Sequence, residues 1–190
     1  EAWAALVSTP DLARFVRDYA PSVAGIEKLN NRPFADSLRL MLNWARAFQG
    51  LTHAPLSLSD ASLDEAAYSL EYDANPFFGA VHSILRLRLC CLLGTPAQAL
   101  DAARVAAGRV HNVPGTVWPV VQCFWNAQAL AAGYAELAGA QAAAALQEMR
   151  EAQAWFEALA QHCEQNYRCP ALLLQGSVAR SEGRESEALA

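Results

Sequence analysis

The sequence predicts an all-α fold, a tetratricopeptide-like α-solenoid of stacked antiparallel helix pairs, and three observations lead to this prediction. Apolar residues recur every three or four positions, which is the period of one helix face. Alternating runs rich in Val, Ile and Thr, which are typical of strands, are missing from the 190-residue sequence. A glycine at an expected helix end, followed five residues later by alanine, recurs along the chain and indicates repeated helix pairs.

Composition bounds the size and the class of the protein. With 54% hydrophobic residues, the chain can bury one sizeable core, so we expect a single helical-repeat domain over residues 1–190. The sequence begins without Met or a signal peptide and ends inside an expected repeat, which indicates a fragment of a larger protein. The net charge is −5 and no stripe of Lys or Arg is present, so nucleic acid is not an expected partner.

The longest apolar run and the cysteines indicate a cytoplasmic protein. Residues 84–93 are apolar except for Arg86 and Arg88, so no membrane-spanning segment is expected. The cysteines are odd in number and unevenly spaced, which argues against a disulfide framework and favours a reducing compartment.

Turn and capping residues set the limits of the first two expected helices. Thr9 and Pro10 open a helix that should end near residue 19, because Pro21 follows. The next helix covers 33–49, with one apolar face and Gly50 as a left-handed cap.

An irregular stretch separates these helices from the rest. Residues 52–61, rich in Ser, His and Pro, form the one long loop that we expect. Ser62 and Glu65 match a capping box, so a helix should begin there and reach about residue 72.

Proline and glycine also mark the expected starts and ends of helices in the second half of the chain. Asn75 and Pro76 begin a helix that should end at Gly94, and Thr95 begins its partner. A break at 113–115 follows, and three further helices are expected at 118–137, 141–163 and about 168–182.

Glycines at 94, 139 and 183 recur at spacings of 45 and 44 residues. Gly94 precedes Ala99 and Gly183 precedes Ala188 by five residues, and Gly139 with Ala144 repeats this spacing. Glycine lets the chain reverse in a short turn, and a small alanine lets two helices approach closely. We therefore expect Ala99 and Ala188 to face the helix before them.

Two patches of the sequence follow a recognisable pattern. Residues 49–52 and 58–68 match a pattern of the form RGLT, FSD and FDEAAF, and residues 156–167 and 179–188 match one of the form CPENF and ARLEGR with a following EA. Both patches resemble the helical region of bacterial multi-module signalling proteins. Departures from the pattern are Leu159, Glu164 and the Cys169-Pro170 pair, where Trp, Pro and His-Lys are usual. The residues that carry the resemblance, to which we assign structural roles, are Gly50, Leu51, Thr52, Asp60, Asp64, Glu65, Cys163, Asn166, Tyr167, Ala179, Arg180, Gly183, Arg184, Glu187 and Ala188.

The resemblance implies a function outside catalysis. Proteins of that family look like a Ser/Thr protein kinase domain followed by a STAND-type ATPase, then tetratricopeptide-like helices, and then usually a GAF domain and a sensor histidine kinase. This chain would be the helical part, a non-catalytic interaction and regulatory module whose partner is another protein or another module of the same chain. The alternative is the ligand-sensing helical domain of a STAND ATPase-type transcriptional activator, and a third is a free-standing enzyme.

Candidate chemical sites are interpreted as structural. No phosphate-binding Gly-rich loop or kinase catalytic motif occurs, so we expect no catalytic and no cofactor-binding residue. The cysteines are Cys90, Cys91, Cys123, Cys163 and Cys169, and their spacing fits no tetrahedral zinc site. His162 cannot activate the thiol of Cys163, because the side chains of adjacent residues on a helix point in different directions. Asp60, Asp64 and Glu65 are expected to cap a helix start.

The aromatic residues of the second half leave one alternative open. We expect most of them in the core, but some could line a concave groove for a peptide or a small molecule. These residues are Trp118, Phe124, Trp125, Tyr134, Trp155 and Phe156.

Overall fold

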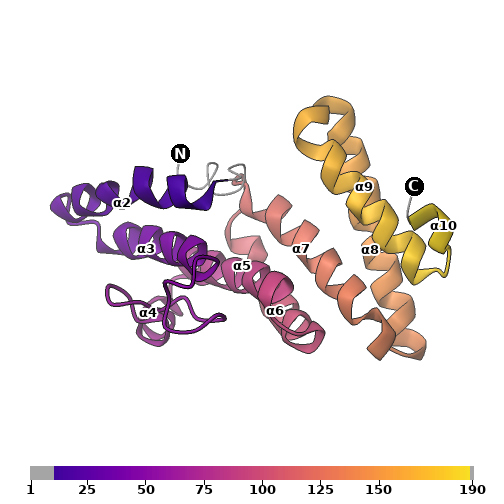
Figure 1. Ribbon diagram of the computed structural model, residues 1–190, viewed down its shortest axis with the longest axis horizontal. Coiled ribbons are helices and arrows are strands. Elements are labelled where there is room, and N and C mark those ends of the chain that lie inside the picture. The colour runs from indigo at the N-terminus through magenta and orange to yellow at the C-terminus, as the bar shows by residue number, and fades with distance from the viewer. Residues whose placement is uncertain (1–10, 189–190) are drawn as a thin grey trace.

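The computed structural model describes residues 11–188, and this part of the chain is all-helical (Figure 1). No strand occurs in it, and its one β-bridge joins Asp60 to Leu63. The all-α prediction is therefore confirmed. The α-helices are α2 (Leu12–Lys28), α3 (Arg32–Ala47), α4 (Glu65–Tyr72), α5 (Pro76–Leu93), α6 (Pro96–Arg109), α7 (Trp118–Gly133), α8 (Gly139–His162), α9 (Glu164–Ser181) and α10 (Glu185–Ala188), with 3-10 turns η1 (Val110–Asn112) and η2 (Tyr134–Glu136).

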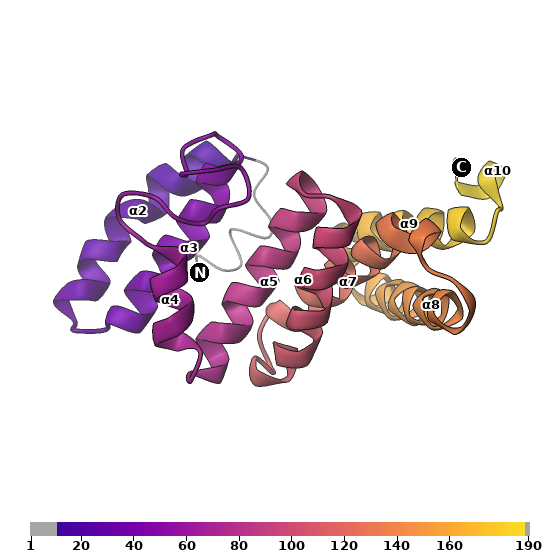
Figure 2. The same ribbon diagram turned by 90° about the horizontal axis from the view of Figure 1, so that it is seen from below.

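Helices that follow each other in the chain lie side by side, and every second helix forms a row. The pairs α2 and α3, α5 and α6, and α8 and α9 are in contact. In addition α3 contacts α5, α5 contacts α7, and α7 contacts α9. Figures 1 and 2 show this row running from the indigo end of the chain at α2 and α3 to the yellow end at α9 and α10.

The buried apolar residues form two clusters that share α7. The larger cluster, which we call the first core, extends from α2 to α7 and includes Trp118 and Val121 of α7. The smaller cluster, the second core, is built from α7, α8 and α9, and includes Ala127 and Ala131 of α7. One helix therefore buries two faces, one in each core.

Two helices are longer than expected, and each contains a proline. The expected end near residue 19 is wrong, since α2 passes through Pro21 and packs Val23 and Ile26 against the first core. The expected start of the last long helix is also wrong, because α9 begins at Glu164 and includes Pro170. A proline removes one backbone hydrogen bond, and in α2 the further apolar contacts offset that loss.

The helix starts differ in detail from the sequence prediction. Asp64, not Ser62, is the N-cap of α4, and its Oδ1 accepts a hydrogen bond from the Ala67 N–H at 2.8 Å. The capping box instead occurs at α6, between Thr95 and Gln98. The expected start at Thr9 lies outside the described residues. Asp11 is the first described residue, and it caps α2.

The repeated glycines occupy turns of different geometry. Gly183 and Gly139 have φ of +75° and +53°, whereas Gly94 has φ −94° and an extended backbone. Gly94 is required for another reason, because a Cβ there would lie 2.7 Å from the Cys90 carbonyl oxygen. The expectation of equivalent turns at Gly94 and Gly183 is therefore wrong in backbone conformation.

The alanines after these glycines agree in helix position for two of the three repeats. Ala99 and Ala188 are each the fourth residue of their helix, and Ala99 is buried in the first core. Ala188 brings its carbonyl oxygen to 3.3 Å from the Cβ position of Gly176, so α10 approaches α9 closely. Ala144 is exposed while Ala145 is buried, which contradicts the expected third repeat.

Among the described helices, α5 alone has the length and apolar composition of a membrane span, and most of it is buried inside the fold. Burial of that kind is equally typical of the central helix of a helical domain, and α5 contacts α3, α4, α6 and α7.

Candidate functional site

The first patch of motif residues holds the irregular connection between α3 and α4. Asp60 Oδ1 accepts hydrogen bonds from the backbone N–H groups of Ser62 at 2.8 Å and Leu63 at 3.0 Å. Its other oxygen, Oδ2, pairs with Nη1 of Arg46 at 2.9 Å. Burial opposes ionisation of Asp60, but the hydrogen bonds from Ser62 and the charge of Arg46 outweigh it and lower the pKa of the carboxyl. The role of Asp60 is therefore to fix a turn.

Glu65 is the first residue of α4, and instead of capping that helix its carboxylate joins the irregular connection to α5. Oε2 accepts a hydrogen bond from the Leu58 N–H at 2.9 Å. Oε1 lies 2.9 Å from His82 Nε2 and 3.4 Å from Arg86 Nε, and Arg86 also donates to the carbonyl of Leu56. Burial would raise the pKa of Glu65, but the hydrogen bonds from His82 and Leu58 and the charge of Arg86 lower it.

The other residues of the first patch have local roles. Gly50 has φ +69° after α3, as expected of a left-handed cap. Thr52 Oγ1 donates to the Ala54 carbonyl at 3.0 Å, and Leu51 is exposed. Asp64 caps α4. None of these contacts places two reactive side chains together.

The second patch lies at the other end of the row of helices (Figure 1). Cys163 forms the corner between α8 and α9, and Asn166 and Tyr167 belong to the first turn of α9. Ala179 is buried near the end of α9 and Arg180 is exposed. Arg184 pairs with Glu182, Gly183 and Ala188 frame the turn into α10, and the side chain of Glu187 lies outside the described part. The structure does not bring the two patches into one site.

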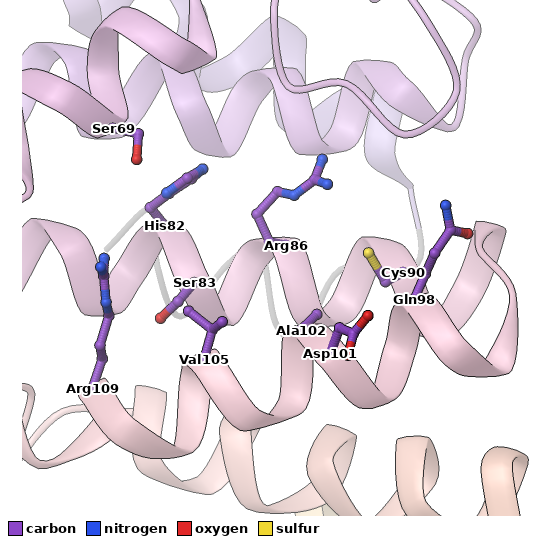
Figure 3. A pocket seen from close by; sticks show the side chains of 10 residues that line it. All are labelled: Ser69, His82, Ser83, Arg86, Cys90, Gln98, Asp101, Ala102, Val105 and Arg109. Atoms are coloured by element: carbon purple, nitrogen blue, oxygen red, sulfur yellow. The ribbon is translucent and has the colours of Figure 1, made fainter. Parts of the chain in front are cut away.

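A groove of about 380 Å³ opens between α4, α5 and α6 (Figure 3). His82 and Arg86 point from α5 toward α4, and both are already paired with Glu65. On α6, Arg109 pairs with Asp73 at 2.7 Å. The basic side chains of the groove are therefore already paired with carboxylates at the two ends of α4, which is typical of a packed interface between helices.

A larger cavity, of about 700 Å³, lies between α5, α7, α8 and α9, at the junction of the two cores. We call it the junction cavity. Aromatic side chains form much of its wall, and two amides occur among its lining residues. It is lined by Arg88, Val117, Val120, Val121, Phe124, Trp125, Phe156, Gln165, Asn166, Tyr167 and Pro170.

Arg88 is the one charged residue that lines the junction cavity, and its side chain is almost completely buried. The residue is 6% exposed, and its Nε and Nη1 have no hydrogen-bond partner among the described residues. Its Cζ lies 4.0 Å from the centroid of the Trp44 ring, so one face of the guanidinium is stacked. Burial lowers the pKa of Arg88 to about 10, and the group therefore still carries its positive charge at neutral pH.

The cysteines are free thiols rather than disulfides. Burial raises the pKa of Cys90, that of Cys91 to about 12 and that of Cys123 to about 11, which keeps these sulfurs protonated and weakly nucleophilic. Within residues 11–188, no group of three or more His, Cys, Asp or Glu side chains is arranged to hold a metal ion.

The sequence indicated part of the aromatic wall of the junction cavity but not the charge of Arg88. Phe124, Trp125 and Phe156 line it, whereas Trp118 is fully buried in the first core. Trp155 and Tyr134 do not line it. The signal for Arg88 was its position inside the long apolar helix α5, where a charged side chain is unusual.

No protein-family model, curated protein or solved structure matches this chain.

Proposed function

We propose that the chain is a non-catalytic helical-repeat module for interaction and regulation within a large bacterial signal-transduction kinase/ATPase. Its helix pairs stack as a tetratricopeptide-like solenoid, and it acts in the cytoplasm on a protein partner or on other modules of its own chain. The single observation that carries this proposal is the row α3, α5, α7 and α9, with α7 buried in both cores.

A shared helix supports a coupling role for a physical reason. A displacement of α8 or α9 changes the packing of Ala127 and Ala131 on one face of α7. It therefore also acts on Trp118 and Val121, which the same helix places in the first core. Packed interfaces shift between discrete arrangements rather than deforming continuously, so a partner that favours one arrangement at one end alters the other end.

The candidate sites also support a role without chemistry. His82 and Arg86 of the groove in Figure 3 are paired with Glu65, and Arg109 is paired with Asp73. The described cysteines with shifted pKa values remain thiols. A catalytic site needs a nucleophile or base within hydrogen-bond reach of a partner that activates it, together with space for a substrate. His82 has such a partner in Glu65, but both hold the irregular connection in place.

The test compares the full-length parent protein with a variant in which this segment is replaced by a flexible linker. We expect the variant to keep its basal nucleotide turnover and to lose the response of its output to the input signal. Isolated chain, incubated with ATP and magnesium, should release no phosphate above the rate of a heat-denatured control. A normal response without the segment, or stoichiometric turnover by the isolated chain, would overturn the proposal.

The junction cavity favours a second candidate function, the ligand-sensing helical domain of a STAND ATPase-type transcriptional activator. Its volume lies in the range of small-molecule sites, and it lies where the two cores meet. A ligand there would bias the same packing that the coupling role requires. The domain order of the parent separates the two functions, since an activator ends in a DNA-binding domain and a signalling kinase in a histidine kinase.

A further inference from the structure

Arg88 is a buried cation whose charge no described residue balances. None of the ion pairs within residues 11–188 includes it. Two of its guanidinium nitrogens also lack a hydrogen-bond acceptor there. The free energy needed to bury an ion without a counter-ion is far larger than the stabilisation from stacking on an indole such as Trp44. An arrangement this unfavourable in the free protein is explained if the counter-ion comes from a ligand.

The shape and lining of the junction cavity indicate what that ligand carries besides its charge. Phe124, Trp125, Phe156 and Tyr167 offer aromatic surface to an apolar body. The amides of Gln165 and Asn166 are exposed, so they can mark the entrance and bind a polar end group. A cavity with mostly apolar walls and a few polar groups that fix orientation is typical of a site for a small organic molecule.

The charge of the site selects the acidic group. Arg88 is the only lysine or arginine among the lining residues of the junction cavity, so the site supplies a single positive charge. A carboxylate carries one negative charge and matches the planar guanidinium with two parallel hydrogen bonds. A phosphate dianion would keep an uncompensated negative charge in the same apolar surroundings.

We propose that the junction cavity binds a small organic acid, with its carboxylate on Arg88 and its apolar or aromatic body against Phe124 and Phe156. Because the ligand contacts α5, α7, α8 and α9, it touches both cores and favours one arrangement between them. This site goes beyond the coupling role proposed above. The coupling role rests on the row of helices, and failure of either proposal leaves the other unchanged.

The first arm of the test uses the unmodified chain and needs no variant. Its probes are 3-phenylpropionate and octanoate, each compared with its neutral amide, by calorimetric titration and tryptophan fluorescence. We expect each acid to bind at least about tenfold more tightly than its amide, as the net value of a charged hydrogen bond implies. Equal affinity of acid and amide, or no binding of either acid at millimolar concentration, would refute the proposal.

The second arm uses Arg88→Met, which keeps an unbranched, apolar side chain at this position and removes the charge. We expect the variant to lose the difference between acid and amide while its melting temperature stays equal or rises, because a buried charge has been removed. The matched control is Arg104→Met, on the exposed face of α6, which should leave binding unchanged. Unchanged acid binding by Arg88→Met would contradict the assignment.

A third arm separates the small acid from a peptide carboxyl terminus, which carries the same group. The probe is the tripeptide Gly-Gly-Phe with a free carboxylate, compared with its carboxamide. Binding of the free acids with weaker binding of the peptide supports the assignment. Binding of the peptide without binding of either free acid would overturn it.

Discussion

Single carboxylates fix the irregular connection between α3 and α4. Asp60 closes a turn within residues 60–63, and Glu65 ties the backbone of Leu58 to His82 on α5. Both carboxyl groups have lowered pKa values although burial opposes ionisation. The motif of the first patch is thus explained by folding, without any reaction.

Replacing Glu65 with Gln tests this account through pH. Because the pKa of Glu65 is lowered in the folded state, its contribution is fully present above the unfolded value of about 4.3 and is lost as the pH falls through the folded value. Urea unfolding at pH 7 and pH 3 should show a smaller loss of stability on acidification for Glu65→Gln than for the unmodified chain. Glu136→Gln, at an exposed position, is the control and should keep the full acid dependence. The same acid dependence in both variants would contradict the role of Glu65.

The sequence could predict part of this network but not its centre. Asp64 was identified as a residue of a helix start, because an acidic side chain there satisfies N–H groups locally. The side-chain partners of Glu65, His82 and Arg86, lie 17 or more residues away on α5, and only tertiary packing brings them together. Arg88 was missed as a site residue for the same reason, since its surroundings come from four helices.

Helix limits were largely predictable because they depend on local chemistry. Gly94 ends α5, Thr95 and Pro96 begin α6, and α3 lies within two residues of its expected limits. The clear failure is Pro21, where packing of the whole helix outweighs the local cost of a proline, and α9 also begins four residues before its expected start. Local signals therefore predict a boundary only where the apolar face also ends.

The close packing of α6 is tested by Ala99→Leu. Ala99 is 1% exposed in the first core, so the added atoms have no free space. We expect the free energy of unfolding to fall by about 1 to 3 kcal/mol in chemical denaturation. Ala107→Leu, on the exposed face of the same helix, should change it by less than about 0.5 kcal/mol. An unchanged stability of Ala99→Leu would count against close packing of this helix.

The contact between α6 and α7 is tested by Gly133→Ala. A Cβ at Gly133 would lie 2.4 Å from Leu100 Cδ1 and 2.9 Å from its Cγ, so the leucine or the helix has to move. The melting temperature should fall, corresponding to a loss of about 1 to 3 kcal/mol. In Gly108→Ala nothing lies within 4 Å of the new methyl group, and this variant should gain up to about 1 kcal/mol from helix propensity. Equal effects of the two substitutions would contradict the packing described.

At the scale of the whole molecule, the class of the fold was predictable and the arrangement of the helices was not. The spacing of apolar residues and the capping, proline and glycine residues at helix ends depend on neighbouring residues, so they predicted the helices and their order. Which helices share a core depends on contacts between distant segments, and the glycine spacing did not reveal that α7 serves two cores. The expected third repeat failed because α8 begins at Gly139, which turns Ala144 outward and Ala145 inward.

The coupling role requires the two cores to respond as one body through α7, and hydrogen exchange during urea unfolding measures whether they do. Pulse labelling followed by mass spectrometry reports peptides of α3 and α5 separately from peptides of α8 and α9. We predict one shared midpoint, as coincident transitions require. Met149→Ala, which opens a hole in the second core at a cost of about 2 to 5 kcal/mol, should lower the midpoint of both sets equally. Unfolding of α8 and α9 at lower urea, with α3 and α5 unaffected by Met149→Ala, would contradict the account.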